Sequence, residues 1–371
     1  MSVSHVLLVC LQEEDGKSLK YTGQLALALL AQGFGVSILT NVPSDSILVG
    51  IHKDIEVFHS PETKWPDLLG GDMVVALRKA LKGDDNISHV HFMGLGRQVL
   101  PLSYVCQRYK TPCLATALND EGFDLPKLPF YMRKKYVKHL DEMAQIIVSS
   151  QGMLEKANIL HFDNISLIKE GVDTDRFKPV LSKRPIRREL DLPEGSTIVC
   201  CMADIEPANK QLETLKLCMP LGDFLHVIFL GKVKDVAYFE KLKEEMRRTA
   251  IEPYVTIRDA VQNPEDYLRA CDVFMLLGGV EKRQTTVLEA QSCGLPVVLD
   301  ASSSALSLTN GNKTGVVLYP NNALAKGAVE KLISDPNFRQ GKALYARPFV
   351  KKEHDFKDMM GSYKKLYENL S

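Results

Sequence analysis

Residues 272–300 read DVFMLLGGVEKRQTTVLEAQSCGLPVVLD and contain a strand, a turn, a helix and a second strand in succession. The apolar run that opens the segment ends at the pair Gly278-Gly279, which breaks a strand. A helical pattern begins near Thr286 and stops at Gly294, and the proline two residues later opens another apolar run. A strand that leads through a helix to a further strand is the repeating unit of a parallel sheet.

The same alternation runs through the rest of the chain. In the first half, amphipathic helical stretches separate the strand-like runs HVLLVCL, GVSILT, DIEVF, HVHFMG, PCLATAL and AQIIVSS. After residue 170 the pattern starts again, with STIVCCMA, HVIFLG, YVTIRDA, DVFMLLG and PVVLD as strands. The sequence therefore predicts an α/β fold with two doubly wound, Rossmann-like domains, separated by a charged, proline-rich segment.

Composition narrows the class of protein. The chain has 371 residues, enough for two domains of ordinary size, and its 46 lysines and arginines equal its 46 aspartates and glutamates, which argues against a dedicated nucleic-acid binder. No apolar run approaches the roughly 18 residues of a transmembrane helix, and the N-terminal run lacks the basic lead-in of a signal peptide. The eight cysteines form no CxxC pair, so we expect reduced, buried thiols in a cytoplasmic protein, without a metal site or a disulfide framework.

The turn after the strand at 272–277 is the first candidate site. In open α/β sheets, ligands bind at the carboxyl ends of the strands, against helix N-termini. The backbone N–H groups that begin the following helix form a seat for a phosphate, and neighbouring cations add charge-assisted hydrogen bonds. The residues are Gln284, Thr285 and Thr286 for the helix start and Lys282 and Arg283 for the cations.

Two glutamates flank that seat, eight positions apart. Glu289 lies one turn into the helix, where a carboxylate can accept hydrogen bonds from the two hydroxyls of a ribose. Glu281, at the end of the strand, lies closer to a sugar beyond the phosphates. The alternative is a capping box from Thr286 to Glu289, in which Glu289 satisfies only the N–H groups of its own helix.

This segment resembles the E-x7-E signature of the retaining nucleotide-sugar glycosyltransferases of family four, which have the two-domain GT-B fold. LEAQSCGLPVV, residues 288–298, follows the family pattern LEA-x-x-x-G-x-P-V-V. The resemblance implies that Glu281 contacts the donor sugar and Glu289 the ribose. It also implies two domains that face each other across a cleft, a nucleoside diphosphate sugar as co-substrate, and no cofactor or metal.

Other segments extend the resemblance over nearly the whole chain. KEGVDTDRFKP, residues 169–179, is similar to the family's NGVD-x-x-x-F-x-P at the start of the second domain. The C-terminal ARPFVKKEHDFKDMMGSYKKLY looks like the family's closing helices, the last of which crosses back to the first domain. We therefore expect an acceptor-side domain at 1–168, a nucleotide-sugar domain at 169–345 and crossing helices at 346–371.

The chain departs from the family at the diphosphate. Lys210 supplies the family's lysine, but Asp204 occupies the approximate position of its arginine. A carboxylate at that position repels a diphosphate instead of neutralising it. Lys282, Arg283 and Lys232 are the candidates to compensate.

Further candidates lie on the first domain. The family's glycine-rich loop has become GKSLKYTG, so we expect an acceptor cradle of side chains from Lys17, Ser18, Lys20 and Tyr21. His91, which shares a strand face with His89, is a candidate contact of the donor sugar or the reacting centre, and a hydrogen-bonded core histidine is the alternative. Asn119 and Asp120 end another strand, where a polar pair binds acceptor or caps a turn.

The helix expected at 130–140, FYMRKKYVKHL, is basic and carries aromatic side chains. One interpretation is peripheral docking at the inner face of a membrane, a use known in many glycosyltransferases of this type. The other is a solvated helix with Tyr131, Val137 and Leu140 turned inward. The zero net charge of the chain favours the second interpretation.

The predicted function is a retaining glycosyltransferase of the hexosyltransferase type that moves a sugar from a nucleoside diphosphate donor, with a UDP-sugar favoured, to an unidentified acceptor. Glu281, His91 and Lys210 are the candidate catalytic residues, and stabilisation of charge on the departing diphosphate is the main catalytic effect. Asp204 and the lost glycines motivate the alternative, a catalytically inactive binding or regulatory subunit with a protein partner. A dinucleotide-dependent oxidoreductase is disfavoured because VCLQEEDGKS lacks G-x-G-x-x-G.

Overall fold

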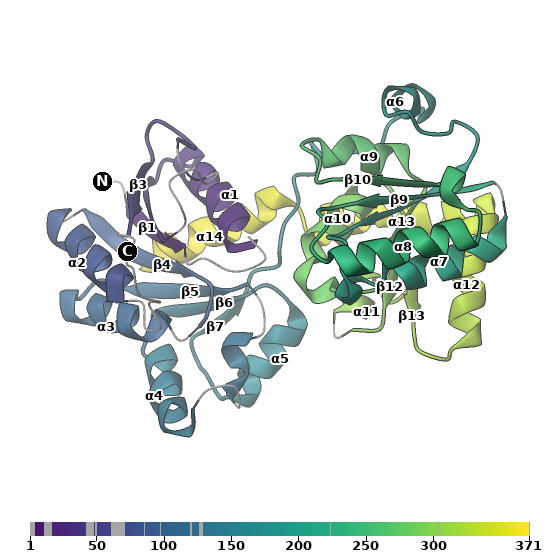
Figure 1. Cartoon of the computed structure of the whole chain (residues 1–371). Coiled ribbons are helices and arrows are strands. Elements are labelled where there is room, and N and C mark those ends of the chain that lie inside the picture. The colour runs from purple at the N-terminus through teal and green to yellow at the C-terminus, as the bar shows by residue number, and fades with distance from the viewer. Residues whose placement is uncertain are drawn as a thin grey trace. The chain divides into compact units, whose positions relative to one another are not determined.

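The computed structural model describes residues 4–10, 17–41, 48, 50–60, 71–84, 86–96, 98–118, 121–125, 129–222, 224–302 and 304–370. The chain divides into two compact units (Figure 1). Unit 1 comprises Met1–Glu170 with Asp358–Ser371, and unit 2 comprises Gly171–Lys357. The change of unit therefore falls between Glu170 and Gly171, in the segment where the sequence pattern starts again.

Unit 1 is built on a parallel sheet that has seven strands in its described residues, in the order β3-β2-β1-β4-β5-β6-β7. The strands are β1 (His5–Cys10), β2 (Gly35–Thr40), β3 (Glu56–His59), β4 (Ile87–Met93), β5 (Cys113–Ala117), β6 (Gln145–Val148) and β7 (Ile165–Leu167). The helices are α1 (Lys17–Ala31), α2 (Gly71–Gly83), α3 (Val99–Tyr109), α4 (Phe130–Asp141), α5 (Gln151–Ile159) and α14 (Phe356–Leu370). Val6 to Cys10 of the inner strand β1 are fully buried, as expected of a strand covered on both faces.

Unit 2 has a parallel sheet of six described strands, in the order β10-β9-β8-β11-β12-β13. The strands are β8 (Thr197–Met202), β9 (Leu225–Leu230), β10 (Val255–Arg258), β11 (Val273–Leu276), β12 (Val297–Asp300) and β13 (Gly315–Leu318). The helices are α6 (Arg184–Glu189), α7 (Gln211–Cys218), α8 (Val236–Arg248), α9 (Pro264–Ala270), α10 (Gln284–Ser292), α11 (Ala305–Leu308), α12 (Ala323–Ser334) and α13 (Pro336–Glu353). Two parallel sheets with interleaved helices confirm the predicted α/β, Rossmann-like fold class.

The segment between the two patterns contains more structure than its turn-rich sequence indicated. The short strand β7 adds to the edge of the first sheet, where Ile165 lies opposite Ile146. The helix α6 of unit 2 has Pro185 near its start and buries the side chain of Arg187. Short elements like these have too few residues to show a periodicity of their own.

The last two helices belong to different units: α13 to unit 2, and α14 from Asp358 onward to unit 1. Arg347 of α13 donates to the carbonyl oxygens of Thr174, Phe177 and Ser292, all in unit 2. From Asp358 onward, α14 belongs to unit 1 and buries Tyr363 and Tyr367 completely. Of the region 346–371 that was expected to cross, α13 therefore stays with unit 2.

The face that α4 turns inward differs from the predicted one. Tyr136 and Leu140 are each only 1% exposed, whereas Tyr131 is 71% exposed. The prediction that Tyr131 turns inward is therefore wrong, while Leu140 does turn inward. The residues at 136 and 140 are four apart and share a helix face, and Tyr131 lies on another face.

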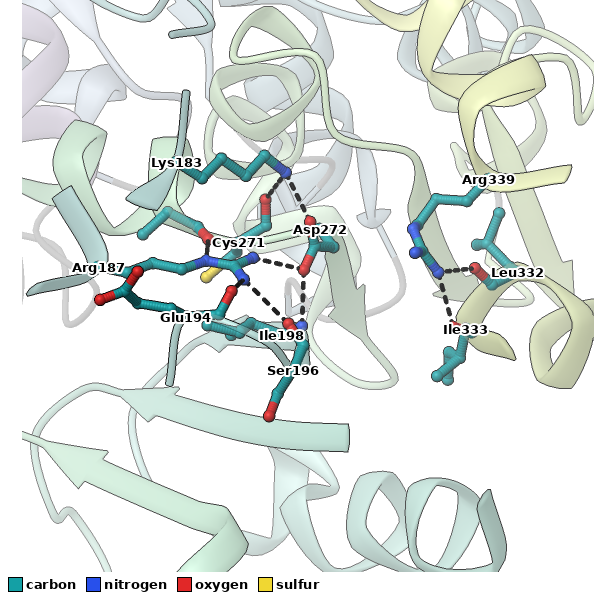
Figure 2. A network of polar contacts seen from close by, with 11 residues as sticks. Lys183, Arg187, Glu194, Ser196, Ile198, Cys271, Asp272, Leu332, Ile333 and Arg339 are labelled. Atoms are coloured by element: carbon teal, nitrogen blue, oxygen red, sulfur yellow. Dashed lines mark hydrogen bonds and ion pairs between the residues drawn. The ribbon is translucent and has the colours of Figure 1, made fainter. Parts of the chain in front are cut away.

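A buried ion network holds α6 at the amino ends of β8 and β11 (Figure 2). The carboxylate of Asp272 accepts from Lys183 Nζ at 2.8 Å, Arg187 Nη2 at 2.6 Å and the backbone N–H of Ile198 at 2.8 Å. Arg187 also donates to the carbonyl oxygens of 270, 194 and 196. Burial alone would raise the pKa of Asp272, but the two cations and the hydrogen bonds outweigh it and hold the pKa below its ordinary value.

Candidate functional site

The candidate site lies at the carboxyl ends of β8, β11 and β12 in unit 2. In a parallel sheet these ends meet at one edge, so the loops that follow them are neighbours. Three side-chain contacts join the loops: Arg283 with Asn209, Glu281 with Ser304, and Lys210 with Asp300.

Two glycines allow the loops after β8 and β11 to approach closely. A Cβ at Gly278 would lie 2.0 Å from the carbonyl oxygen of Ala208, a distance that no side chain tolerates. Gly279 has a φ of +64°, and its Cβ would lie 2.8 Å from Asn209 Oδ1 and 2.7 Å from Arg283 Nη1. Glycine is thus required at 278 and 279, because these residues pack against the turn at 207–209.

Helix α10 begins at Gln284, two residues earlier than predicted. Its N-cap is Arg283, with φ −125° and ψ 28°, and no side chain caps it. Thr286 therefore lies inside the first turn, and the capping box of Thr286 with Glu289 is wrong. The first-turn N–H groups of 284–286 have no acceptor within the helix and carry the positive end of its dipole, as a phosphate seat requires.

Glu281 lies in a one-turn 3-10 helix, Val280–Lys282, ahead of α10. Its Oε1 accepts from the backbone N–H of Ser304 at 2.9 Å, and its Oε2 accepts from the Ser304 hydroxyl and from Gln284 Nε2 at 3.1 Å. These bonds fix the carboxylate between the ends of β11 and β12.

Glu289 is 5% exposed on α10. The pKa of Arg176 is raised, chiefly by its hydrogen bond with Glu265, and the charge of Glu289 contributes. Arg176 itself forms two hydrogen bonds with the Glu265 carboxylate, at 2.9 and 3.1 Å. The carboxylate of Glu289 therefore interacts electrostatically with Arg176, which is also paired with Glu265.

Asp204, which stands where the family has an arginine, is next to an arginine from another loop. Its Oδ2 lies 3.9 Å from Arg283 Nη2, and its Oδ1 accepts from the backbone N–H of Lys232 at 3.2 Å. Arg283 Nη1 also donates to Asn209 Oδ1 at 3.0 Å. Of the three candidate compensating cations, Arg283 is the one whose side chain reaches Asp204, whereas the side chains of Lys282 and Lys232 are exposed.

Lys210 adopts a left-handed backbone conformation, with φ +53°, and its ammonium group donates to Asp300 Oδ2 at 2.9 Å. The pair lines a cavity of about 530 Å³ together with Leu277, Tyr319 and Lys326. Asp300 is not among the residues predicted from the sequence, although it is the polar residue that ends the apolar run PVVLD, and a polar residue at the end of a strand is a signal for a site. Asn209 was missed because nothing in its local sequence marks it.

In unit 1, His91 is fully buried at the centre of a hydrogen-bond network. Its Nδ1 pairs with the Tyr367 hydroxyl and its Nε2 with Thr116 Oγ1 at 2.8 Å. Burial lowers the pKa of His91 to about 3. These surroundings are those of the alternative predicted for His91, a hydrogen-bonded core histidine.

The acceptor-side candidates are placed as follows. Tyr21 is buried, and its hydroxyl pairs with that of Tyr363 at 3.0 Å. Ser18 is 1% exposed, and Lys20 is exposed. The side chain of Lys17, and Asn119 with Asp120, lie outside the described residues.

Among the described residues, no group of three His, Cys, Asp or Glu side chains is placed to hold a metal ion. No helix in the described part of the chain combines the length and the hydrophobicity needed to span a bilayer. All eight cysteines are described, and each is buried and unbridged.

Residues 182–347 match the family model "Glycosyl transferases group 1". The chain is 28% identical to D-inositol 3-phosphate glycosyltransferase of Arthrobacter sp., a match that covers 89% of this chain and 85% of that protein. It is 24% identical to the lipopolysaccharide core biosynthesis mannosyltransferase LpsB of Rhizobium meliloti, over 41% of this chain and 46% of the relative. The chain thus spans less than half of the length of that second relative.

Solved structures with the same fold cover the whole chain. A glycosyltransferase from Rickettsia africae has a TM-score of 0.83 at 17% identity and covers 100% of this chain and 99% of its own. Anabaena Alr3699/HepE in complex with UDP and glucose has a TM-score of 0.78 at 15% identity and covers 97% and 98%. The chain therefore has the GT-B fold, its residues 182–347 match the glycosyl transferases group 1 model, and the two relatives named above are glycosyltransferases by name.

Proposed function

We propose that this protein is a retaining glycosyltransferase that moves a hexose from a nucleoside diphosphate donor, with a UDP-sugar favoured, to an acceptor. The observation that carries the proposal is the convergence of an uncapped helix N-terminus, two cations and two glutamates at one sheet edge of unit 2. The match of this unit to the group 1 family supports it. The choice of uridine rests on the likeness to Anabaena Alr3699/HepE, whose structure holds UDP and glucose.

In the proposed site, the diphosphate lies against the N–H groups that begin α10. Arg283 and Lys210 supply the positive charge from either side, and Gln284, Thr285 and Thr286 supply the backbone donors. Charge that develops on the leaving diphosphate is stabilised by groups already oriented for it, which lowers the barrier without reorganisation. Retention needs no separate general base when the leaving phosphate accepts the proton of the acceptor.

The two glutamates bind the rest of the donor. Glu289 accepts from the ribose hydroxyls, and Glu281 accepts from the sugar hydroxyls. The bonds from Ser304 and Gln284 hold Glu281 in one orientation, which favours a single sugar stereochemistry.

Arg283 is proposed to take the role of the family's arginine, whose position Asp204 occupies in this chain. Its guanidinium lies between the loops after β8 and β11, held by Asn209, and neutralises the nearby Asp204. Asp204, which motivated the inactive-subunit alternative, is thus paired with a cation, which supports the proposal that Arg283 serves the diphosphate. Lys210 reaches the same edge, and its exchange from Asp300 to a diphosphate is a rotation of one flexible side chain.

The test is calorimetric titration of the protein with UDP, GDP and ADP and their sugars, for wild type and Glu289→Gln. A ligand at about 100 times its Kd should stabilise the fold by about 2.7 kcal/mol. We expect UDP to bind wild type and to bind Glu289→Gln more weakly, while Glu252→Gln, a change at an exposed glutamate of unit 2, binds as wild type. Binding of none of the nucleotides would overturn the donor site and leave the binding-subunit alternative.

A further inference from the structure

Lys210 has a backbone that is held on both sides. Its N–H donates to the carbonyl oxygen of Pro207 at 3.2 Å, and its own carbonyl oxygen accepts from the N–H of Thr214 at 3.0 Å, at the start of α7. Its φ of +53° is left-handed, a conformation that a residue with a side chain adopts at a cost. Such conformations persist where the surrounding structure imposes them, and they cluster at functional sites. The part of Lys210 that remains able to move is its side chain.

The backbone of Lys210 lies beside the proposed phosphate seat. The preceding residue, Asn209, accepts at 3.0 Å from Arg283, which is the N-cap of α10. The turn at 207–209 also packs so closely against Gly278 that a Cβ there would lie 2.0 Å from the carbonyl oxygen of Ala208. From this backbone position, the long and flexible side chain of a lysine can turn toward a diphosphate at the start of α10.

The ammonium group of Lys210 is engaged by a different partner. It donates to Asp300 Oδ2 at 2.9 Å, in the cavity of about 530 Å³ between α7 and α12. The described lining of this cavity includes the ends of β11, β12 and β13, but no residue of α10. Asp300 is held at the end of β12, opposite Leu318 of β13. The side chains of Lys210 and Asp300 are 46% and 23% exposed, so water screens the ion pair and the lysine can leave it at little cost.

We propose that Asp300 is a positioning residue of the donor site, which holds the ammonium group of Lys210 when the site is empty and competes with the diphosphate for it when a nucleotide binds. This inference rests on the proposed function and deepens it. An ammonium group has three N–H donors but a single positive charge, so a carboxylate that shares it weakens its attraction for a diphosphate. Asp300 therefore lowers the affinity for the donor, and it gives Lys210 a partner again when the nucleoside diphosphate product leaves.

The cavity contains a second carboxylate, which distinguishes the ion pair from a general effect of charge. Glu213 of α7 lines the same cavity, three residues after Lys210. Its side chain is exposed, and the described part of the chain contains no ion pair between Glu213 and Lys210. Lys326 of α12, another cation of the lining, lies 4.0 Å from Glu330. Asp300 is thus the carboxylate placed to control Lys210, and Glu213 offers a matched control of equal charge.

Calorimetric titration of the full chain with UDP compares wild type with three single variants. We expect Asp300→Asn to bind UDP about three- to five-fold more tightly, in keeping with the strength of an exposed ion pair. Asp300→Glu keeps the competing carboxylate and should show no such gain, and Glu213→Gln keeps the ion pair and should bind as wild type. In a Lys210→Gln background, Asp300→Asn should have little effect, because no ammonium group is left to compete for. An equal gain in that background would assign the effect to charge repulsion alone and overturn the role of Asp300 through Lys210.

Acetylation of the lysines with acetic anhydride, read by mass spectrometry, tests the ion pair without a nucleotide. Lys210 should react faster in Asp300→Asn than in wild type, whereas the exposed Lys241 should react equally in both, and thermal melting establishes that each variant is folded. Equal acetylation of Lys210 in the two proteins would show that Asp300 does not hold it.

The two measurements separate this inference from the proposed function. If wild type binds UDP while Asp300→Asn binds it equally or more weakly, the donor site stands and the competition by Asp300 is overturned. If wild type binds no nucleotide, the donor site itself is wrong, and the role of Asp300 is overturned with it even where Lys210 reacts faster in the variant.

Discussion

At the scale of single residues, the site depends on side chains whose partners lie far away in the sequence. Asp204 and Arg283 are seventy-nine positions apart and meet across two loops. Asp204 occupies the approximate position of the family's arginine, and the fold brings the guanidinium of Arg283 within 3.9 Å of its carboxylate.

Arg283→Gln should weaken UDP binding. Loss of hydrogen bonds from a charged donor costs about 1.5–3 kcal/mol, so we expect the Kd for UDP to rise about 10- to 100-fold in calorimetry. Uridine, which has no phosphate, should bind both proteins equally. Lys282→Gln is the control, since this lysine is next to Arg283 in the chain and its side chain is exposed. Unchanged UDP affinity in Arg283→Gln would remove Arg283 from the diphosphate site.

His91 makes the stability of unit 1 depend on pH. Its pKa is about 3 in the fold against 6.5 in an unfolded chain, so the unfolded chain binds the proton first as the pH falls. The free energy of unfolding is therefore greatest above pH 6.5 and decreases below it, by about 1.4 kcal/mol per pH unit.

Urea unfolding of wild type and His91→Gln over this range measures the effect. We expect a shallower pH slope in the variant, with a lower stability above pH 6.5 because the bonds to Tyr367 and Thr116 change. His52→Gln, which replaces a partly exposed histidine, is the control variant. If the free energy of unfolding depended on pH equally in wild type and His91→Gln, its pH dependence would not come from His91.

At the scale of elements, the two edges of the second sheet have different tasks. The carboxyl edge carries the proposed donor site, whose loops are joined by exposed or half-buried polar contacts. The amino edge carries the Asp272 network, in which one carboxylate bonds the side chains of Lys183 and Arg187 (Figure 2). The proposed site and the ion network therefore lie at opposite ends of the strands.

Asp272→Ala should destabilise unit 2 strongly. It leaves Arg187, whose side chain is 6% exposed, without its carboxylate, and breaking a buried ion pair on one side costs about 3–5 kcal/mol. Glu194→Ala breaks the exposed pair with Arg188, which water and salt screen, and should cost far less than Asp272→Ala. Denaturant unfolding compares the two variants. Because the pKa of Asp272 is lowered in the fold, its contribution is complete above its unfolded pKa and is lost as the pH falls through the folded pKa.

At the scale of the whole molecule, each unit has its own sheet and its own hydrophobic core. All the donor residues proposed above lie within Gly171–Lys357. We therefore expect the isolated segment 171–357 to fold and to bind UDP with an affinity within a few-fold of the full chain. Calorimetry on that segment checks this, with its Glu289→Gln variant as the control. A folded segment that binds no UDP, beside a full chain that does, would show that unit 1 completes the donor site.

Unit 1 has a different requirement, because part of it comes from the end of the chain. Tyr363 and Tyr367 of α14 are fully buried and contact Thr116 and His91 of the sheet. A chain that ends at residue 357 lacks both tyrosines and leaves Thr116 and His91 without these partners, so α14 is part of the core of unit 1.

The sequence by itself determined the fold class and the edge on which the proposed donor site lies, because strand and helix periodicities are local and the carboxyl ends of parallel strands always meet. It also selected Glu281 and Glu289 from their positions around a helix start, while Lys210 and the return of the last helix to the first domain came from the family resemblance. Only the tertiary structure decided which loops touch: the pairing of Arg283 with Asp204 and of Glu281 with Ser304. Such contacts depend on strand order and on distances of a few ångströms between segments far apart in the chain, and no local pattern records them.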